Sequence, residues 1–281
     1  MHFYFVAFEL FTFILLIICF LHARTQGKPR LVELITLVVN GLLLEKLTIL
    51  FFREYTYGDG FLIMVQDVPL SIAFGWAAII YSAMETTNML GIPLAARPLY
   101  DTLLALNIDL SMDAIAIRAG FWKWLNGGEW FGVPYGNFLG WICVVFFFSF
   151  SVRLLRKHPP GNEAIRVITI LVSSLLPLIL MLKIWALWVP DILKGAIIAG
   201  ILLIFLTVVL LKSKGFANSH NYRIMAVPFV FHIFFLFLLI HERFYAEVPL
   251  LLPLSAGMLI LGFAGHFPQS VRRSLSKGFK S

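Results

Sequence analysis

The sequence predicts an all-α fold: a polytopic transmembrane helical bundle of about nine spans that forms a single membrane domain over residues 1–281. Of the 281 residues, 60% are hydrophobic and only 13% are charged, whereas a soluble domain is about 25% charged. The 22 basic and 15 acidic residues cannot cover the surface of a soluble fold of this length. These observations exclude a soluble enzyme, a secreted disulfide module and a disordered chain.

The predicted spans are apolar runs of about 20 residues, the length that crosses the hydrocarbon core of a bilayer. They cover residues 2–21, 31–52, 67–84, 98–118, 136–152, 164–186, 190–211, 222–241 and 247–267. The first run lacks a basic n-region and a small-residue cleavage site, so we interpret it as a membrane helix and not as a signal peptide. Only a turn near Pro190 separates spans six and seven, which leaves eight or ten spans as alternatives.

The segment before span five is rich in aromatic residues and glycine. Its aromatic residues are Trp122, Trp124, Trp130, Phe131, Tyr135 and Trp141, and its glycines recur every four residues from Gly128 to Gly140. Pro134 argues against one continuous helix, so we predict a re-entrant or interfacial loop. An aromatic belt at the headgroup level explains part of this composition, but not its concentration in one loop.

The basic residues stand in short groups between apolar runs, which is typical of membrane loops and not of a nucleic-acid surface. Most of them fall in alternate loops and in a basic tail, 268–281. The positive-inside rule then predicts a cytoplasmic C-terminus and, with nine spans, an external N-terminus. We expect the cell inner membrane as the location. The cysteines, Cys19 and Cys143, lie within apolar runs and indicate neither a disulfide framework nor a zinc site.

Carboxylates inside predicted spans are costly and mark functional candidates, and span four is the richest, with Asp101, Asp109 and Asp113. Asp109 and Asp113 are four residues apart, which places them on one helix face about 6 Å from each other. Such a pair in a low dielectric should share one proton and titrate together, as general acid–base chemistry requires. Glu45 in span two falls at a similar depth. Two other interpretations stay open: a structural pair satisfied by Arg118, tyrosines and backbone groups, or a proton or cation relay.

Other polar positions give weaker signals. His232 lies within span eight, but no H-x-x-H, H-x-x-x-H or E-x-x-H spacing accompanies it. We therefore predict that His232 is a hydrogen-bonded packing residue. The sequence has no P-loop, no G-x-S-x-G and no dinucleotide fingerprint, so nucleotide-driven work is not expected.

The central segment reads Asp109-Leu-Ser-Met-Asp113, then Gly120-Phe-Trp-Lys-Trp124, then Gly128-Glu-Trp-Phe-Gly-Val-Pro-Tyr-Gly-Asn-Phe-Leu-Gly-Trp141. It resembles the integral-membrane carotenoid hydratase family, which includes bisanhydrobacterioruberin and gamma-carotene 1′,2′-hydratases. A weaker match is Tyr55-Thr-Tyr57 leading to Trp76, so the resemblance covers about residues 45–141. Two departures are Ala114 in place of the family's proline and the absence of an R-T-G-x-P-F-G run. The C-terminal helices, 164–267, match only as generic membrane helices.

The resemblance implies an enzyme that adds water across the terminal C1=C2 double bond of a linear carotenoid dissolved in the bilayer. Asp109, Asp113 and Glu45 would supply the acid–base chemistry. The substrate-binding residues would be Tyr55, Tyr57, Trp122, Trp124, Trp130, Phe131, Tyr135, Asn137 and Trp141. No metal or other cofactor is implied. The expected partners are the carotenoid, membrane lipid and other enzymes of the pathway, with no nucleic acid.

Three other functions remain alternatives at this stage. Another proton-initiated carotenoid end-group enzyme, such as a cyclase, would use the same acid but exclude water. A proton-coupled small-solute transporter would use Asp109 and Asp113 as a relay, but the inverted repeats typical of such proteins are not visible. A non-catalytic assembly partner in a carotenoid complex would tolerate loss of both carboxylates.

Overall fold

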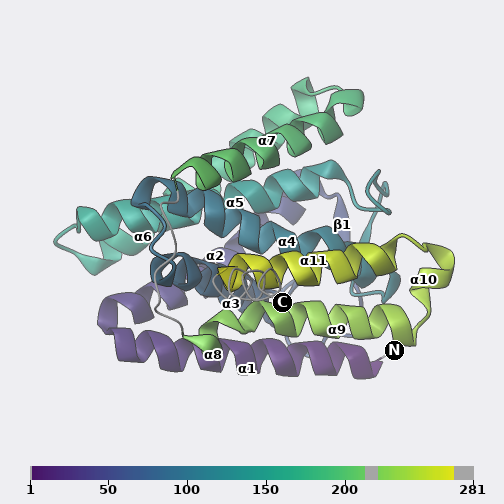
Figure 1. The fold of residues 1–281 in the computed structure, drawn as a ribbon, viewed down its shortest axis with the longest axis horizontal. Coiled ribbons are helices and arrows are strands. Elements are labelled where there is room, and N and C mark those ends of the chain that lie inside the picture. The colour runs from purple at the N-terminus through teal and green to yellow at the C-terminus, as the bar shows by residue number, and fades with distance from the viewer. Residues whose placement is uncertain (1, 213–220, 269–281) are drawn as a thin grey trace, which may run out of the picture.

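A computed structural model describes residues 2–212 and 221–268, and it is a bundle of long helices that run roughly side by side (Figure 1). The helices are α1 (His2–Gln26), α2 (Lys28–Phe52), α3 (Leu70–Met89), α4 (Arg97–Arg118), α5 (Tyr135–Lys157), α6 (Glu163–Trp188), α7 (Asp191–Lys212), α8 (Tyr222–Met225), α9 (Val227–His241), α10 (Phe244–Glu247) and α11 (Leu251–His266). A 3-10 turn, Leu94–Ala96, precedes α4. The short strands are β1 (Tyr55–Tyr57), β2 (Met64–Val65), β3 (Val68–Pro69) and β4 (Trp122–Trp124).

Helices occupy all nine ranges predicted as spans, the eighth as the consecutive helices α8 and α9. Within the described residues, 6 helical segments are long and apolar enough to cross a membrane: α1, α2, α5, α6, α7 and the α8–α9 segment. The shorter α11 is also apolar. The chain therefore has the character of a membrane protein, while nine spans and the orientation of the termini stay predictions. The predicted basic tail lies outside the described residues from position 269 onwards.

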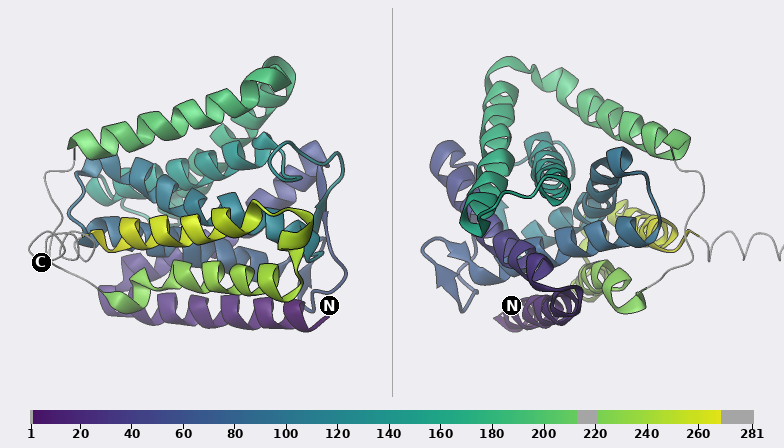
Figure 2. Two further views of the ribbon diagram at one scale, coloured as in Figure 1. Left: turned by 45° about the vertical axis from the view of Figure 1, so that its right-hand side comes forward. Right: turned by 90° about the vertical axis from the view of Figure 1, so that its left-hand side faces the viewer.

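The helices α3 and α4, which are not among these 6 segments, form the interior of the bundle. Most of their side chains are buried, and α4 packs against α3, α5, α9 and α11. Because protein and not lipid surrounds them, these helices can carry polar side chains that a lipid-facing helix could not. At the opposite extreme, α7 lies at the edge of the bundle in both views of Figure 2, and most of its side chains are exposed.

Two loops at one end of the bundle meet through a short antiparallel strand pair. In it β1 pairs with β4, so that Tyr55 lies opposite Trp124 and Tyr57 lies opposite Trp122. The loops approach so closely that a Cβ on Gly58 would lie 2.2 Å from a backbone oxygen of the facing loop. The segment predicted as a re-entrant or interfacial loop is thus a strand followed by a turn bridged at Trp130 and Val133. Its entry into the membrane stays a prediction.

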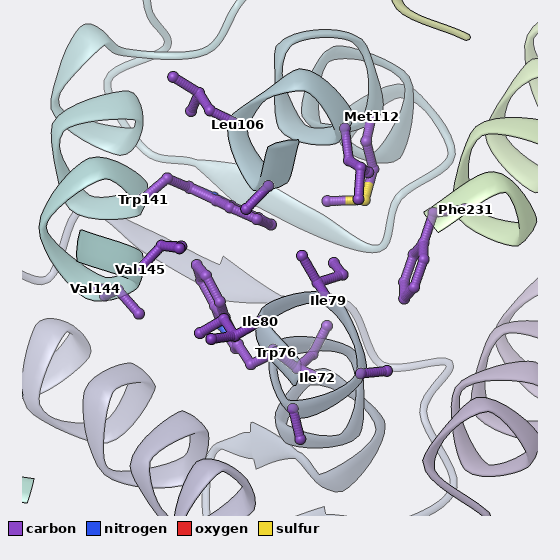
Figure 3. Packing of buried hydrophobic residues seen from close by; sticks show 14 of the residues in the cluster. Ile72, Trp76, Ile79, Ile80, Leu106, Met112, Trp141, Val144, Val145 and Phe231 are labelled. Atoms are coloured by element: carbon purple, nitrogen blue, oxygen red, sulfur yellow. The ribbon is translucent and has the colours of Figure 1, made fainter. Parts of the chain in front are cut away.

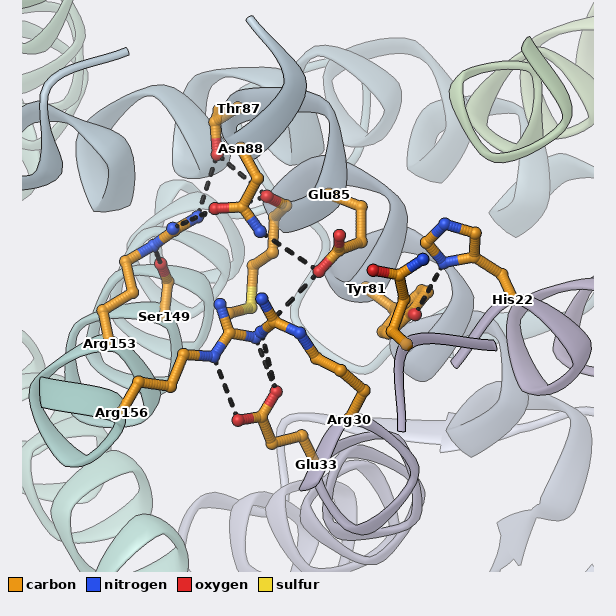
Figure 4. Close-up of polar contacts among 12 residues, drawn as sticks. His22, Arg30, Glu33, Tyr81, Glu85, Thr87, Asn88, Ser149, Arg153 and Arg156 are labelled. Carbon is orange, nitrogen blue, oxygen red and sulfur yellow. Dashed lines mark hydrogen bonds and ion pairs between the residues drawn. The ribbon is translucent and has the colours of Figure 1, made fainter. Parts of the chain in front are cut away.

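A buried network of charged residues joins the helices at the other end of the bundle (Figure 4). Glu33 on α2 accepts hydrogen bonds from Arg156 on α5 and Arg166 on α6, each at 2.5 Å. Asp101 on α4 forms an ion pair of 2.7 Å with Arg153 on α5. Glu33 is 12 positions before Glu45, or about 18 Å along the helix axis. This network therefore holds the bundle together far from the carboxylates of interest.

Candidate active site

A cavity of about 310 Å³ lies inside the bundle, next to the end that carries β1 and β4. Most of its walls come from α2, α3, α4, α5, α6 and the two loops, with single residues from α1, α7 and α9. Figure 3 shows the cluster of buried hydrophobic residues that supplies its aromatic and aliphatic lining, in which the ring centroids of Trp76 and Trp141 lie 4.1 Å apart. Further apolar lining residues are Ile72, Ile79, Met112, Val144 and Phe231. The volume is at the lower end of the range for ligand pockets.

Asp109 and Asp113 both line this cavity and are buried, one helical turn apart on α4. The Nδ2 group of Asn137, in the first turn of α5, donates a hydrogen bond of 2.9 Å to each carboxylate. The four-residue spacing thus places both side chains on one face, and a single amide from the neighbouring helix bridges them.

The two aspartates differ in their remaining partners. Asp113 accepts further hydrogen bonds from the indole Nε1 atoms of Trp122 and, at 3.3 Å, Trp124. These donors favour its charged form. In contrast, Oδ1 of Asp109 is buried and has no hydrogen-bond partner among the described residues. Because buried polar atoms are almost always paired, this oxygen is available to a molecule in the cavity.

Glu45 faces the same cavity from α2, and both of its oxygens are occupied. Oε1 accepts a hydrogen bond of 2.7 Å from Trp76 Nε1, and Oε2 accepts from the hydroxyls of Tyr57, at 2.7 Å, and Tyr55. Burial, followed by the nearby Glu45 carboxylate, raises the pKa of both tyrosine hydroxyls well above their ordinary range. Both tyrosines therefore remain donors at neutral pH and hold Glu45 in place.

The cavity also brings together most of the predicted substrate-binding residues. Those that line it are Tyr55, Tyr57, Trp122, Trp124, Tyr135, Asn137 and Trp141. Trp130 and Phe131 do not line it: Trp130 Nε1 donates to the backbone oxygen of Leu110 at 2.9 Å, and the two rings pack on each other at 5.1 Å. These two aromatics hold the loop against α4. This placement does not support the prediction that they bind substrate.

The structure gives no support to the interpretation in which Arg118 satisfies the aspartates. Its guanidinium donates to the backbone oxygens of Ala114 and Phe131, at 2.6 and 2.9 Å. His232 has the predicted packing contact, with Nε2 lying 3.1 Å from Asn107 Oδ1. Within residues 2–212 and 221–268, no three His, Cys, Asp or Glu side chains come together in a way that could hold a metal ion.

Several lining residues were not predicted from the sequence as part of a site. Trp76 belongs to the weaker upstream match, and it donates directly to Glu45. Three charged residues line one end of the cavity, namely Glu54, Glu129 and Lys194, which we call the charged mouth. Glu54 directly precedes the Tyr-x-Tyr element, whereas nothing in the sequence connects Lys194 on α7 with the aspartates.

A comparison with protein families gives one result. A family model described as carotenoid biosynthesis protein matches residues 4–211, from α1 to the end of α7. The match therefore spans most of the chain and contains both aspartates, Glu45 and the β1–β4 loops. No curated protein and no solved structure gives a significant match.

Proposed function

Because the chain belongs to the carotenoid biosynthesis protein family, we propose that it is an enzyme that hydrates the end group of a linear carotenoid. In this reaction water adds across the terminal C1=C2 double bond and gives a tertiary alcohol. The observation that carries the proposal is a buried, amide-bridged aspartate pair inside an aromatic cavity that has a charged mouth. The pair can supply a proton and accept one, which is what hydration of an alkene needs.

Asp109 is the proposed acid. Asp109 lines the cavity, and its buried Oδ1 atom has no partner among the described residues, so this carboxyl group is the one left to give a proton to the substrate. Transfer of that proton to C2 uses the electron pair of the double bond to form the new C–H bond. The positive charge then develops at C1, which carries three carbon substituents.

The aromatic lining is the proposed stabiliser of this cation. Faces of Trp and Tyr rings attract a positive charge, and Trp76 and Trp141 pack together in the wall beside the aspartates. The Glu45 carboxylate contributes a negative charge across the cavity, held by three donors. Glu45 is therefore a positioning and electrostatic residue in this mechanism, and its saturated oxygens leave the acid role to Asp109.

Asp113 is the proposed base. Its charged form, surrounded by donors from Trp122, Trp124 and Asn137, accepts a proton from water as the water oxygen bonds to C1. The substrate thereby gains one hydrogen and one hydroxyl group. A proton transfer from Asp113 back to Asp109 within the pair restores the starting state, so no oxidant or reductant is consumed.

The charged mouth is the feature that supports hydration over cyclisation in this proposal. A cyclase must keep water away from its cation, whereas this cavity reaches Glu54, Glu129 and Lys194 at one end. Charged side chains bind water, so the mouth supplies the nucleophile that hydration needs. This feature favours water capture over proton loss as the fate of the cation.

The test is expression of the protein in a bacterium that accumulates lycopene, followed by mass analysis of the extracted pigments. We expect products heavier than lycopene by one or two waters. The control is the doubly substituted Asp109→Asn, Asp113→Asn protein at an equal level in the membrane, which should leave lycopene unchanged. A new pigment of unchanged mass would indicate cyclisation and overturn hydration, as would unmodified lycopene beside the intact protein.

A further inference from the structure

The cavity is too small for the whole of the proposed substrate. Its volume of about 310 Å³ is near the lower limit of pockets that enclose drug-sized ligands, about 300–1,000 Å³. A linear carotenoid is larger than this space. If the proposed function is correct, only the reacting end group lies beside the aspartates, and the remaining polyene must leave the protein through an opening in the wall.

One side of the cavity has no such opening. Phe8 on α1, Ile72 on α3 and Phe231 on α9 line this side and are all buried. Phe231 also packs against Phe11 of α1, with ring centroids 5.3 Å apart. The polyene therefore cannot leave between α1 and α9 without displacing core residues.

The edge between α2 and α6 is different. Four residues of these helices line the cavity and are not fully buried: Thr48 and Phe52 on α2, and Leu182 and Ala186 on α6. Nearer the charged network, Asn40 and Ser174 join the same two helices through a hydrogen bond of 2.7 Å.

Beyond Asn40, no hydrogen bond or ion pair joins α2 to α6 in the part of the chain that the structure describes. The one polar contact there is cation–π, with Lys183 Nζ 5.1 Å from the centre of the Phe51 ring. A hydrogen bond thus joins the two helices at one end, whereas at the other end they are held by no hydrogen bond or ion pair.

Apart from Lys183, which is exposed beside Phe51, the surface around this edge is apolar. Its exposed side chains are Leu50 and Phe51 on α2 and Leu180, Met181 and Ile184 on α6. In a membrane protein such a surface faces hydrocarbon, whereas the charged mouth of the same cavity is suited to water. The cavity therefore has an apolar edge between α2 and α6 and an adjoining charged end, because Phe52 and Glu54 are two residues apart and Lys194 Nζ lies 5.9 Å from the centre of the Trp185 ring.

We propose that the edge between α2 and α6 is a lateral portal, through which the polyene of the bound substrate extends into the bilayer. The inference rests on the proposed function for the identity of the polyene. It assigns the two reactants separate routes, because the carotenoid arrives from lipid at the portal and water arrives at the charged mouth.

A crosslinking experiment tests the portal independently of turnover. Leu182, which lines the cavity, is replaced by the photoreactive residue benzoylphenylalanine, and Leu180, which is exposed on the same helix but does not line the cavity, is the matched control. Both proteins are irradiated in membranes that contain lycopene. We expect a protein–lycopene adduct at position 182 in clear excess over position 180. Equal adducts at both positions, or none at 182, would overturn the portal.

Lycopene-containing membranes with the unsubstituted protein are analysed for hydrated pigment in parallel, which separates the two ideas. An adduct at position 182 without hydrated product would count against the proposed function and still support a polyene portal. Hydrated product without an adduct at 182 would support the function and overturn the portal.

A second pair of variants tests the portal through substrate length. Leu182→Trp narrows the edge, and Leu180→Trp adds the same bulk on the lipid side. With lycopene we expect Leu182→Trp to lose at least about tenfold in hydration rate, as steric exclusion from apolar pockets commonly does. With myrcene, a short acyclic terpene with the same dimethyl-substituted double bond, its rate should stay close to that of Leu180→Trp. An equal loss with both substrates would overturn the portal, because it would indicate damage to the cavity itself.

Discussion

The two aspartates of α4 are chemically identical residues in different surroundings. Asp113 accepts hydrogen bonds from Trp122, Trp124 and Asn137, while Asp109 accepts only from Asn137 and keeps one buried oxygen without a partner in the described residues. The structure thus distinguishes two residues that the sequence alone does not. This difference gives the Asp→Asn substitutions unequal consequences for stability.

The first prediction concerns these substitutions. In the Asp109→Asn and Asp113→Asn proteins, hydration should fall by about 10²–10⁴-fold, the usual contribution of general acid–base catalysis. Asp113→Asn should also destabilise the protein by about 1–3 kcal/mol, because its new NH₂ group would face donors. Asp109→Asn should leave stability nearly unchanged. Pigment analysis and thermal unfolding in detergent measure the two effects, with the exposed Asp191→Asn as a control. Near-normal hydration in both variants would remove the aspartates from the mechanism.

Glu54 at the charged mouth gives a prediction about pH. Burial raises the pKa of this carboxyl, opposed by the nearby Lys194, so folding disfavours its charged form. The protonated carboxyl therefore contributes most to stability below its ordinary pKa of about 4.3. This contribution is lost as the pH rises through the higher pKa of the folded protein. Glu54→Gln should raise the melting temperature at neutral pH and have no effect in acid below the ordinary pKa.

Thermal unfolding of Glu54→Gln at both pH values checks this expectation. Glu129→Gln, at an exposed position of the same mouth, is the matched control and should change the melting temperature little at either pH. If Glu54→Gln raised the melting temperature equally in acid, burial of the charged carboxyl would not be the cause. If Glu54→Gln raised the melting temperature at neutral pH and also slowed hydration, Glu54 would serve function at a cost in stability.

Single residues also show where prediction from the sequence ends. The spacing of Asp109 and Asp113 fixes their common face, because helix geometry alone determines it. Asn137 was expected to bind substrate; it lines the cavity, and its bridge between the aspartates was not expected. Trp76 was not expected in the site at all. Both contacts depend on how α3 and α5 pack against their neighbours, which no local pattern encodes.

At the scale of elements, the β1–β4 pair shows the same limit. Each strand has 3 residues, too few for a periodicity signal, and their partners are far apart in the sequence. The predicted loop was therefore identified by its aromatic composition but not by its pairing. Its glycines have a local reason that the structure supplies: a Cβ on Gly128 would lie 2.0 Å from the backbone nitrogen of Pro134. The turn closes only if residue 128 has no side chain.

The charged network gives a prediction at this scale. Glu33 is the common acceptor for Arg30, Arg156 and Arg166, so Glu33→Gln removes the nearest counter-charge of all three and leaves Arg30 and Arg166 only longer ion pairs, with Glu85 at 3.8 Å and Glu163 at 3.7 Å. Arg166 is only 6% exposed and cannot turn to water, and removal of one partner from a buried ion pair typically costs about 3–5 kcal/mol. We expect a large loss of thermal stability, with hydration per folded molecule unchanged because the cavity is remote.

The matched control is Glu163→Gln. Glu163 also pairs with Arg166, at 3.7 Å, but its side chain is 52% exposed, so its removal should cost little. Thermal unfolding and the hydration rate of both variants in the same detergent provide the comparison. Equal stability of the two variants would mean that the network does not fasten the helices.

The whole molecule is arranged around α3 and α4, and the sequence predicts this only in part. Length and apolar content place a helix in each of the nine ranges, including these two. Their lower apolar content follows from burial in protein, as with Asp101 and Asp109, which are 0% and 1% exposed. Whether a helix is central or peripheral depends on the packing of all the others. The sequence therefore indicates a bundle with polar residues inside it, but not which helices enclose the cavity.

The last prediction concerns the C-terminal helices, which lie beyond the family match at residues 4–211. Helices α9 and α11 pack against α4: Asn107 contacts His232 at 3.1 Å, and the Tyr100 hydroxyl donates to the backbone oxygen of Gly265 at 2.9 Å. Phe231 of α9 also completes the cavity wall. In a chain that ends at Lys212, Asn107 and the Tyr100 hydroxyl would lose these hydrogen-bond partners, and the cavity would be open to lipid.

We therefore expect the chain of residues 1–212 to accumulate poorly and to form no hydrated pigment. Co-expression with a separate chain of residues 213–281 should restore part of both, because helices that are inserted separately can still associate in a membrane through packing and hydrogen bonds. Expression of 213–281 alone is the control and should give no product. Protein level and pigment mass in the same cells measure the outcome. Full activity of residues 1–212 alone would contradict the enclosing role of α9 and α11, because the acid and its base would then function without the wall that Phe231 completes.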